Sequence, residues 1–439
     1  MDIKEYINKN YDGANDWFVD ECNSIYHQQR VNKVLDIKQY LAGQHKILNR
    51  QIEYYNGRQF YPRTIVLQYA KTLINFSVSY LLKNPATLTG DEDTVKEFKE
   101  VYKRGKYNRI DFDILDKMIK YGSVYEYVYI DSNSKDIKSK LIPAEDSYPI
   151  YNENNEMVAF IEHWTTSDNI SYYVVYYPDT VEKWNNAGGN LNLEGVYNNP
   201  SGLPIVYKTQ NELDSTEGRS DLEDWINIID NLEDLISKYT DAVYKFVCNP
   251  LPVIVGQKLA INEKTGEGAV SQHVVGHGIN LDDGSNFFFA NSQLDYQSFE
   301  QLFKILKQAL LDISCTPAIS MNSQDVSNLS EVSIRLLFSL ADIKAGLNER
   351  YLKEGFEQRF EVISRLLKLK GIQVDDNNIG VVFEYARPMN ETDIINNLKT
   401  LAEMNSISLQ TILEHSPFVN DVSQEMERIK DKVGQFGRD

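Results

Sequence analysis

The pattern of apolar and polar positions divides the N-terminal half of the chain into helical and strand-like stretches. Residues 25–41 and 64–82 carry apolar side chains at helical spacing, and Pro85 follows the second stretch, where a helix must end. A further helical pair is predicted at 93–103 and 110–121. The first quarter of the chain is therefore expected to be helical.

The pattern then changes to alternation with a period of two, which is typical of strands. Four such stretches lie at 124–130, 157–164, 171–177 and 181–184, separated by segments rich in Asn, Asp and Gly. Short strands joined by such turns predict an antiparallel sheet.

Two further helical stretches enclose a small insert. Residues 220–247 form the first helix and residues 296–313 the second, and strand-like pieces with several glycines lie between them at 252–255, 273–279 and 287–290. This arrangement indicates a helical stalk that carries a small β cap.

A long apolar stripe begins after Glu331 and keeps helical spacing for roughly forty residues, which corresponds to a helix of about 60 Å. Its members are Leu336, Leu340, Ile343, Leu347, Tyr351, Phe356, Phe360, Ile363 and Leu367. We predict one continuous helix that can kink at Gly346 or Gly355. A strand at 380–385 and short helices at 391–404, 409–415 and 421–433 are expected to follow.

The composition adds little to these predictions, whereas the net charge restricts the class of protein. The chain has 439 residues, of which 42% are hydrophobic and 25% charged, as in ordinary packed proteins. Its formal net charge is −19. Because a surface that grips nucleic acid is normally basic, the charge excludes a tight DNA binder but permits a protein that contacts DNA without holding it.

The cysteines and the N-terminus favour a protein of a reducing compartment. Cys22, Cys248 and Cys315 are an odd number of widely spaced thiols without a CxxC pair. The start of the chain lacks the pattern of a secretory signal. The most apolar window, 65–82, contains three polar residues, so we expect a buried helix rather than a membrane span.

Candidate metal and catalytic residues are weak. His273 and His277 have the spacing of a helical zinc site, but Gly276 and Gly278 argue against a helix there. We expect no metal site and no cofactor. The paired carboxylates Asp282-Asp283 and Asp375-Asp376 lie in predicted turns, and no pattern of a known catalytic class occurs, so we expect no catalytic residues.

One enzymatic alternative stays open at this stage. Most of the 28 tyrosines lie on predicted strands, where they suit half-buried surfaces but also suit a sugar-binding cleft. The alternative is therefore an acidic cytoplasmic hydrolase that acts on carbohydrate with a carboxylate pair.

Five blocks of sequence occur in a set order along the chain. They are YLAGQHKILNR…YYNGR with AKTLINFSVSYLLKNPATLTG, FDILDKMIKYGSVYEYVYID with LIPAEDSYPIYNEN, GRSDLEDWINIIDNLEDLISKY, TPAISMNSQDVSNLSEVSIRLLF, and FEYARPMNETDIINNLKTL…ISLQTILEHSPFVNDVSQEMERIK. Together they resemble the portal proteins of tailed bacteriophages, of the type found in phages of Gram-positive hosts. No block is specific alone, and Ser330-Glu331 departs from the Ser-Gly pair that the family often has there.

The resemblance implies an α+β portal fold in a ring oligomer, with long stem helices, an antiparallel β-rich wing, a small β clip and a helical crown. The implied parts are the wing (1–219), first stem helix (220–247), clip (248–294), second stem helix (295–315), tunnel loop (316–330), long helix and wing strand (331–387) and crown (388–439).

It also implies which residues contact DNA. The tunnel loop would present Asn322, Ser323, Gln324, Asp325, Ser327 and Asn328. The first stem helix would present an acidic wall that repels phosphate, with Asp224, Asp230, Glu233, Asp234 and Asp241 as candidates.

The implied function is a DNA channel at one capsid vertex that serves genome packaging, head assembly, head–tail joining and DNA ejection. The implied partners are eleven further copies of the chain, double-stranded DNA without sequence specificity, the large terminase subunit, the head–tail adaptor, and the major capsid and scaffolding proteins. No membrane is involved, and the expected location is the virion, with assembly in the host cytoplasm.

Overall fold

The computed structural model describes residues 2–55, 58–244, 251–256, 283–290, 295–318, 331–374, 379–388 and 391–414, with isolated positions between 416 and 429. The chain divides into two compact units. Unit 1 contains Met1–Asn32, Leu73–Asp221 and Ser314–Asp439, and unit 2 contains Lys33–Thr72 and Leu222–Ile313. Two of the four boundaries fall within helices, α3 (Ile25–Leu41) and α4 (Tyr69–Leu82), and the other two lie next to Leu222 and Ile313.

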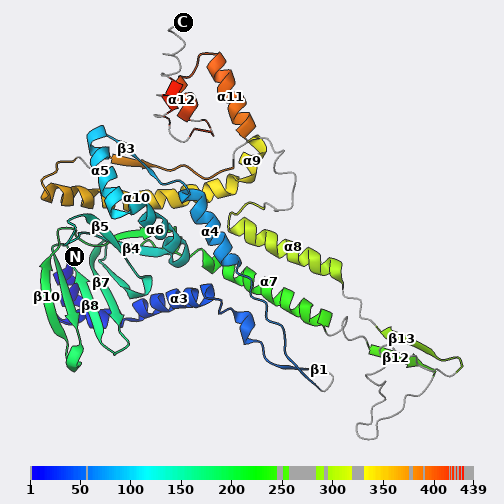
Figure 1. Ribbon diagram of the computed structural model, residues 1–439. Coiled ribbons are helices and arrows are strands. Elements are labelled where there is room, and N and C mark those ends of the chain that lie inside the picture. Colours follow the sequence, from blue (N-terminus) through cyan, green and yellow to red (C-terminus); the bar gives the residue numbers. More distant parts are fainter. Residues whose placement is uncertain are drawn as a thin grey trace. The chain divides into compact units, whose positions relative to one another are not determined.

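Two antiparallel sheets form most of the β part of unit 1 (Figure 1). The larger has the strand order β10-β9-β8-β7-β6 and the smaller β11-β4-β5. The strands are β4 Ser123–Ile130, β5 Ile137–Ile142, β6 Ser147–Tyr151, β7 Met157–Thr165, β8 Ser171–Tyr176, β9 Thr180–Asn185, β10 Asn192–Asn198 and β11 Ile205–Lys208. Each is antiparallel to its neighbours, which confirms the predicted mixed fold with antiparallel sheet.

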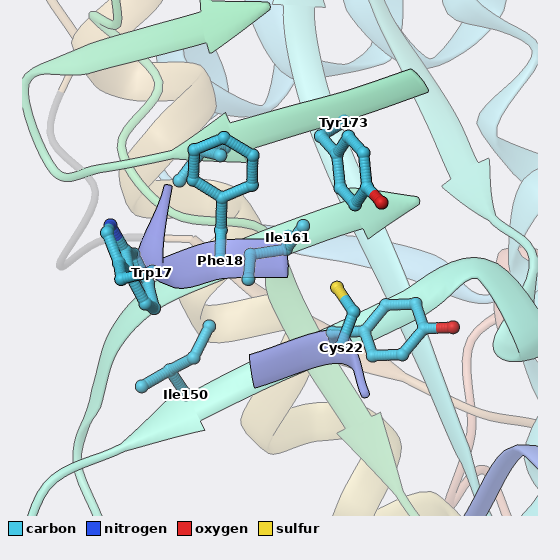
Figure 2. Packing of buried hydrophobic residues seen from close by; sticks show 9 residues of the cluster. Trp17, Phe18, Cys22, Ile150, Ile161 and Tyr173 are labelled. Atoms are coloured by element: carbon cyan, nitrogen blue, oxygen red, sulfur yellow. The ribbon is translucent and has the colours of Figure 1, made fainter. Parts of the chain in front are cut away.

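Strands β6, β7 and β8 of the five-stranded sheet are buried on both faces, whereas the edge strand β10 is exposed. On one face, α2 (Trp17–Cys22) places Trp17, Phe18 and Cys22 against Ile161 and Tyr173 (Figure 2). On the other face, Phe160 and Val174 pack with Tyr125 and Ile142 of the smaller sheet. Neighbouring residues on one strand point to opposite faces, so strands buried on both faces contain consecutive apolar residues.

The helices of unit 1 include α1 Ile3–Tyr11, α5 Glu92–Gly105, α6 Tyr107–Tyr121, α9 Glu331–Leu337, α10 Ser339–Leu369, α11 Glu391–Glu403 and α12 Leu409–Glu414, with short 3₁₀ turns at Ala144–Asp146 and Ala187–Gly189. A two-stranded sheet pairs β3 (Thr87–Gly90) with β14 (Ile379–Val382). The predicted strand at 380–385 therefore exists, though it begins and ends earlier.

A buried ionic network, here called the Arg359 network, ties α10 to the rest of unit 1. The Arg359 side chain is 0% exposed; its Nε lies 2.9 Å from Glu126 and its Nη1 lies 2.5 Å from Asp111. Tyr207 donates a hydrogen bond to the same Glu126 oxygen at 2.6 Å. Burial raises the pKa of Asp111 to about 6, against the opposing effect of the guanidinium.

The packing around the Arg359 network also explains why residue 355 is a glycine. A Cβ on Gly355 would lie 2.2 Å from the ring of Tyr207, so only glycine allows α10 and β11 to approach this closely. The predicted long helix is interrupted elsewhere: α9 and α10 meet at Phe338, and neither Gly346 nor Gly355 breaks the helix. The two glycines therefore do not interrupt the helix, and Gly355 allows close packing against Tyr207.

Unit 2 contains α7 (Leu222–Ala242) and α8 (Tyr296–Ile313), which pack against each other (Figure 1). The rings of Tyr239 and Phe299 stack between them, with centroids 3.9 Å apart. The remaining elements are the 3₁₀ helix η1 Lys46–Asn49 and two hairpins that pair β1 Glu53–Tyr55 with β2 Arg58–Phe60, and β12 Leu251–Val255 with β13 Asn286–Ala290. Two strands of the predicted insert thus pair with each other.

Two further observations bear on the predicted organisation. Residues 33–72 belong to unit 2, whereas the sequence grouped them with the wing; the range 1–219 for the wing stays a prediction. Among the described residues, no helix combines the length and the apolar character that a membrane crossing requires.

Candidate functional site

The five predicted wall acids of α7 fall into two groups. Asp224 is exposed, Asp230 is half-buried, and Asp234 is half-buried and lies 2.8 Å from Lys238. Glu233 and Asp241 are 0% and 3% exposed. A wall that faces DNA needs carboxylates that face solvent, so the prediction was wrong for these two residues.

An extended segment, residues 63–67, explains why these two acids are buried. Alternate main-chain N–H groups of this segment donate to side chains spaced four residues apart on α7. The hydrogen bonds join Arg63 to Asp241 (2.8 Å), Ile65 to Ser237 (3.0 Å) and Leu67 to Glu233 (2.7 Å). Two residues of an extended chain advance about 6.6 Å and four residues of a helix about 6.0 Å, so successive bonds stay in register.

This set of three hydrogen bonds, here called the ladder, also corrects the predicted start of a helix. The apolar pattern predicted a helix from residue 64, but α4 begins at Tyr69. The N–H groups of Ile65 and Leu67 are occupied by α7 side chains, and the segment that contains them is extended. Helical spacing of apolar residues does not reveal a competing hydrogen-bond partner that lies far away in sequence.

Two basic side chains contact the buried acids of α7. Arg50 lies 2.8 Å from Asp241 and also donates to Glu53 at 3.1 Å. His45 Nδ1 lies 2.7 Å from Glu233 Oε1, and the imidazole ring stacks on Tyr40 with centroids 3.8 Å apart. Burial raises the pKa of Glu233 and that of Asp230.

Sequence reasoning missed His45 and Arg50 for a physical reason. His45 and Glu233 are 188 residues apart, so no local spacing connects them. The only local signal was the pair of acids at 230 and 233, which share one face of a helix.

The predicted tunnel-loop residues lie outside the described part of the chain. They are Asn322, Ser323, Gln324, Asp325, Ser327 and Asn328, and their role stays a prediction. The same holds for His273 and His277, and for the paired acids Asp375-Asp376.

The first part of the predicted apolar stripe is exposed, not buried. Val332, Leu336, Leu340, Ile343 and Leu347 have exposed fractions between 39% and 71%, and we call them the α9–α10 stripe. Val332 and Leu336 are four residues apart on α9, and Leu340, Ile343 and Leu347 are three or four residues apart on α10, so each set shares one face of its own helix. The later members of the predicted stripe, such as Phe356 and Leu367, are buried.

The five-stranded sheet borders a cavity of about 540 Å³ with an aromatic lining that includes Tyr127, Trp164 and Tyr172. Its carboxylates are already engaged: Glu162 accepts from Lys140 at 2.5 Å and from Tyr176 at 3.1 Å, and Glu194 accepts from Asn185. These contacts give the hydrolase alternative no carboxylate pair poised for catalysis.

Comparison with protein families decides between the two hypotheses. A family model described as phage portal protein, SPP1 Gp6-like, matches residues 24–435. The chain belongs to this family of portal proteins. The match covers most of the sequence, so the predicted resemblance is confirmed and the hydrolase alternative has no support.

Individual portal proteins are more distant in sequence. The portal protein of Bacillus phage SPP1 is 21% identical over 397 residues, which cover 83% of this chain and 75% of the relative. A chain from the virion of a native gene transfer agent particle overlaps 78% of this chain and 86% of its own length, at 9% identity and a TM-score of 0.44. A chain from the neck of the native particle, computed with C12 symmetry, overlaps 78% and 89%, at 10% identity and a TM-score of 0.46. Similarity at these TM-scores supports no argument about function.

Proposed function

We propose that this portal-family chain forms a ring of twelve subunits around a DNA channel at one vertex of a phage capsid. The ring serves head assembly, genome packaging, head–tail joining and DNA ejection. The observation that carries the proposal is the family match over residues 24–435. The chain has no chemistry of its own in this role and contacts double-stranded DNA without sequence specificity.

The α9–α10 stripe supports assembly into a ring. Contiguous exposed apolar side chains such as Leu336, Leu340 and Ile343 mark a protein–protein contact. A closed ring repeats one heterologous interface, so each subunit needs two different complementary faces. The stripe supplies part of one of them.

The charge of the chain supports a channel that does not hold DNA. The net charge is −19, and Asp224 and Asp234 keep solvent exposure on α7. Repeated twelve times, these carboxylates form an acidic wall that repels phosphate. The tunnel loop, 316–330, contacts the passing duplex through its uncharged polar side chains, with Asp325 adding no attraction.

The remaining parts bind the other components of the head. The clip, 248–294, contacts the large terminase subunit during packaging and the head–tail adaptor afterwards. The outer part of the ring contacts the major capsid and scaffolding proteins. Assembly takes place in the host cytoplasm, and the ring then stays in the virion at the portal vertex.

Native mass spectrometry and electron microscopy of the purified full chain test the proposal. We expect a closed ring of about a dozen subunits with a central opening. A monomer or dimer at micromolar concentration, together with hydrolysis of a carbohydrate panel, would contradict the proposal and restore the enzymatic alternative.

A charged substitution in the α9–α10 stripe tests whether the stripe forms part of the subunit interface. Ile343→Asp is expected to reduce the ring population at least tenfold, because it buries an unpaired charge in the interface. The matched control is Gln358→Asp, which adds the same charge at an exposed position of the same helix. Equal ring populations for both variants would show that the stripe is not an interface.

The tunnel loop is tested by deletion. Removal of residues 320–329 is expected to leave ring assembly intact and to impair DNA packaging in a reconstituted assay. If the deletion abolishes assembly instead, the loop is an interface and the proposed contact with DNA is wrong.

The acidic wall is tested by charge reversal. Rings with Asp224→Lys and Asp234→Lys are expected to retain linear duplex DNA at low salt and to release it as salt rises. The control reverses Asp168 and Asp179, which are exposed in turns of the five-stranded sheet. Equal retention by both rings would place the α7 acids outside the channel.

A further inference from the structure

Unit 2 contains a cluster of three potential metal ligands, of which two are buried and one is half-buried. His45 directly precedes η1, whereas Asp230 and Glu233 lie one turn apart on α7. One ligand atom from each side chain lies within 4.8 Å of the other two. Zinc binds nitrogen and oxygen ligands at about 2.0–2.2 Å, so tetrahedral ligand atoms lie roughly 3.5 Å apart. Small side-chain rotations bring the three groups to this separation.

The hydrogen bonding inside the cluster is incomplete. His45 is 2% exposed and Glu233 is 0% exposed. His45 Nε2 and Glu233 Oε2 are buried and have no hydrogen-bond partner, although the other nitrogen and the other oxygen of the two side chains contact each other. Buried polar atoms are normally paired, so these two atoms are available to a ligand. The Arg359 network also leaves Asp111 Oδ2 and Glu126 Oε1 unpaired, but both of its carboxylates already contact a guanidinium.

The charge of the cluster specifies the kind of ligand. Two carboxylates and one imidazole are held together where Glu233 is 0% exposed and Asp230 is half-buried, and burial opposes negative charge. The exposed Lys46 acts on Asp230 but lies outside the three-residue cluster. A divalent cation compensates both carboxylates at once, which a single protonated imidazole cannot do. One nitrogen and two oxygen ligands suit zinc or a similar transition ion better than calcium, which prefers oxygen alone.

The surroundings hold the ligands in place. The imidazole ring of His45 stacks on Tyr40, and the Leu67 N–H fixes Glu233 Oε1 at 2.7 Å. Ligands in metal sites are commonly oriented by such outer contacts. Three protein ligands leave a fourth coordination position for water.

We propose that His45, Asp230 and Glu233 form a divalent metal site of the zinc class that fastens the segment before η1 to α7. The site differs from the sequence-based expectation, which considered only His273 and His277 and foresaw no metal. It does not depend on the proposed channel function, because all three ligands and their supports lie within unit 2.

Zinc binding to the full chain tests the proposal. The chain is freed of metal with a chelator, and zinc is added against a competing chromogenic chelator. We expect about one zinc ion per chain. Asp230→Asn keeps the size of the side chain but weakens the ligand, so it is expected to lower zinc affinity at least tenfold. Asp234→Asn, one turn farther along α7 and beside Lys238, is the matched control and is expected to change affinity less than twofold.

Two further measurements keep the test decisive. Cobalt in place of zinc is expected to show no thiolate charge-transfer band, which excludes binding by the three cysteines. Zinc is expected to slow hydrogen exchange around residues 45 and 230–233 in the wild type, but not in His45→Gln. The proposal is overturned if no zinc is retained, if Asp230→Asn binds zinc as well as Asp234→Asn does, or if the cobalt spectrum shows thiolate ligands.

Discussion

Each unit contains a group of carboxylates that are buried or half-buried, but different side chains contact them in the two units. In unit 1, Asp111 and Glu126 lie on either side of Arg359, whose guanidinium contacts both. In unit 2, Asp230 and Glu233 lie beside His45, which contacts one of them directly. The first network contains a permanent cation, whereas the second contains a side chain that is a cation only when protonated.

The difference separates a structural network from a candidate binding site. Arg359 is always charged and is enclosed by the rings of Phe356 and Tyr107, so an added ion has no place there. The His45 cluster offers nitrogen and oxygen atoms with unused lone pairs, which an added cation can bind. Buried acids alone therefore do not indicate a ligand. The difference is that Asp111 and Glu126 contact a fully buried guanidinium, whereas Lys46, which acts on Asp230, is exposed.

The largest expected effect comes from removing the built-in cation. Arg359→Leu leaves Asp111 and Glu126 buried without a counter-charge and is expected to lower the free energy of unfolding by about 3–5 kcal/mol. Urea denaturation followed by circular dichroism measures it. Arg350→Leu on the same helix is the control, since Arg350 is exposed and lies 3.9 Å from Glu354. Arg350→Leu is expected to lower the free energy of unfolding by less than about 1 kcal/mol. Similar losses for both variants would mean that the Arg359 network contributes little to stability.

A smaller effect is expected in unit 2. Asp241→Ala removes the acceptor for the Arg63 N–H and the partner of Arg50, at a cost of about 2–3 kcal/mol. Hydrogen–deuterium exchange is expected to show faster exchange in α7 while α10 keeps its protection. Asp224→Ala, at an exposed position, is the control; faster exchange in both helices would show that the two units unfold together.

The packing of the Arg359 network is tested with a single methyl group. Gly355→Ala places a Cβ 2.2 Å from the Tyr207 ring, and the resulting overlap is expected to cost about 1–3 kcal/mol. Thermal melting of the purified chain detects the change. An unchanged melting temperature would mean that β11 can move away from α10 without penalty.

The smallest expected effect has the opposite sign. Gly346→Ala on the same helix has its nearest neighbour, the Tyr385 hydroxyl, at 3.6 Å, which is ordinary contact. Alanine is better than glycine within a helix, so a gain of about 0.5–1 kcal/mol is expected. A loss at this position would show that α10 needs flexibility there.

Patterns within single elements were predictable from the sequence. The bounds of α3 and α8 were predicted to the residue, and β7 and β8 to within one residue. Strands β5, β6, β10 and β11 were not predicted, because they are short or lack clear alternation. The sequence did not show that the α9–α10 stripe is exposed. Spacing indicates which residues share a helical face, but not whether other parts of the chain cover that face.

Contacts between distant residues were not predictable. Arg359 is one of several charged residues in the second half of a long helix, and its partners Asp111 and Glu126 lie more than 230 residues earlier. The acids of α7 were seen as a group, but only the fold shows which are exposed. The family was recognisable because five weak blocks in order carry information that no single residue carries.

The ladder between residues 63–67 and α7 places unequal demands on the two partners. The segment contributes only main-chain N–H groups to these hydrogen bonds, so they depend on its length and not on its side chains; deleting one residue would turn every second amide away from the helix. On α7 the opposite holds, because the acceptors are the side chains themselves. The two spacings also differ by about 0.6 Å per step, so the mismatch accumulates and limits such a ladder to a few rungs.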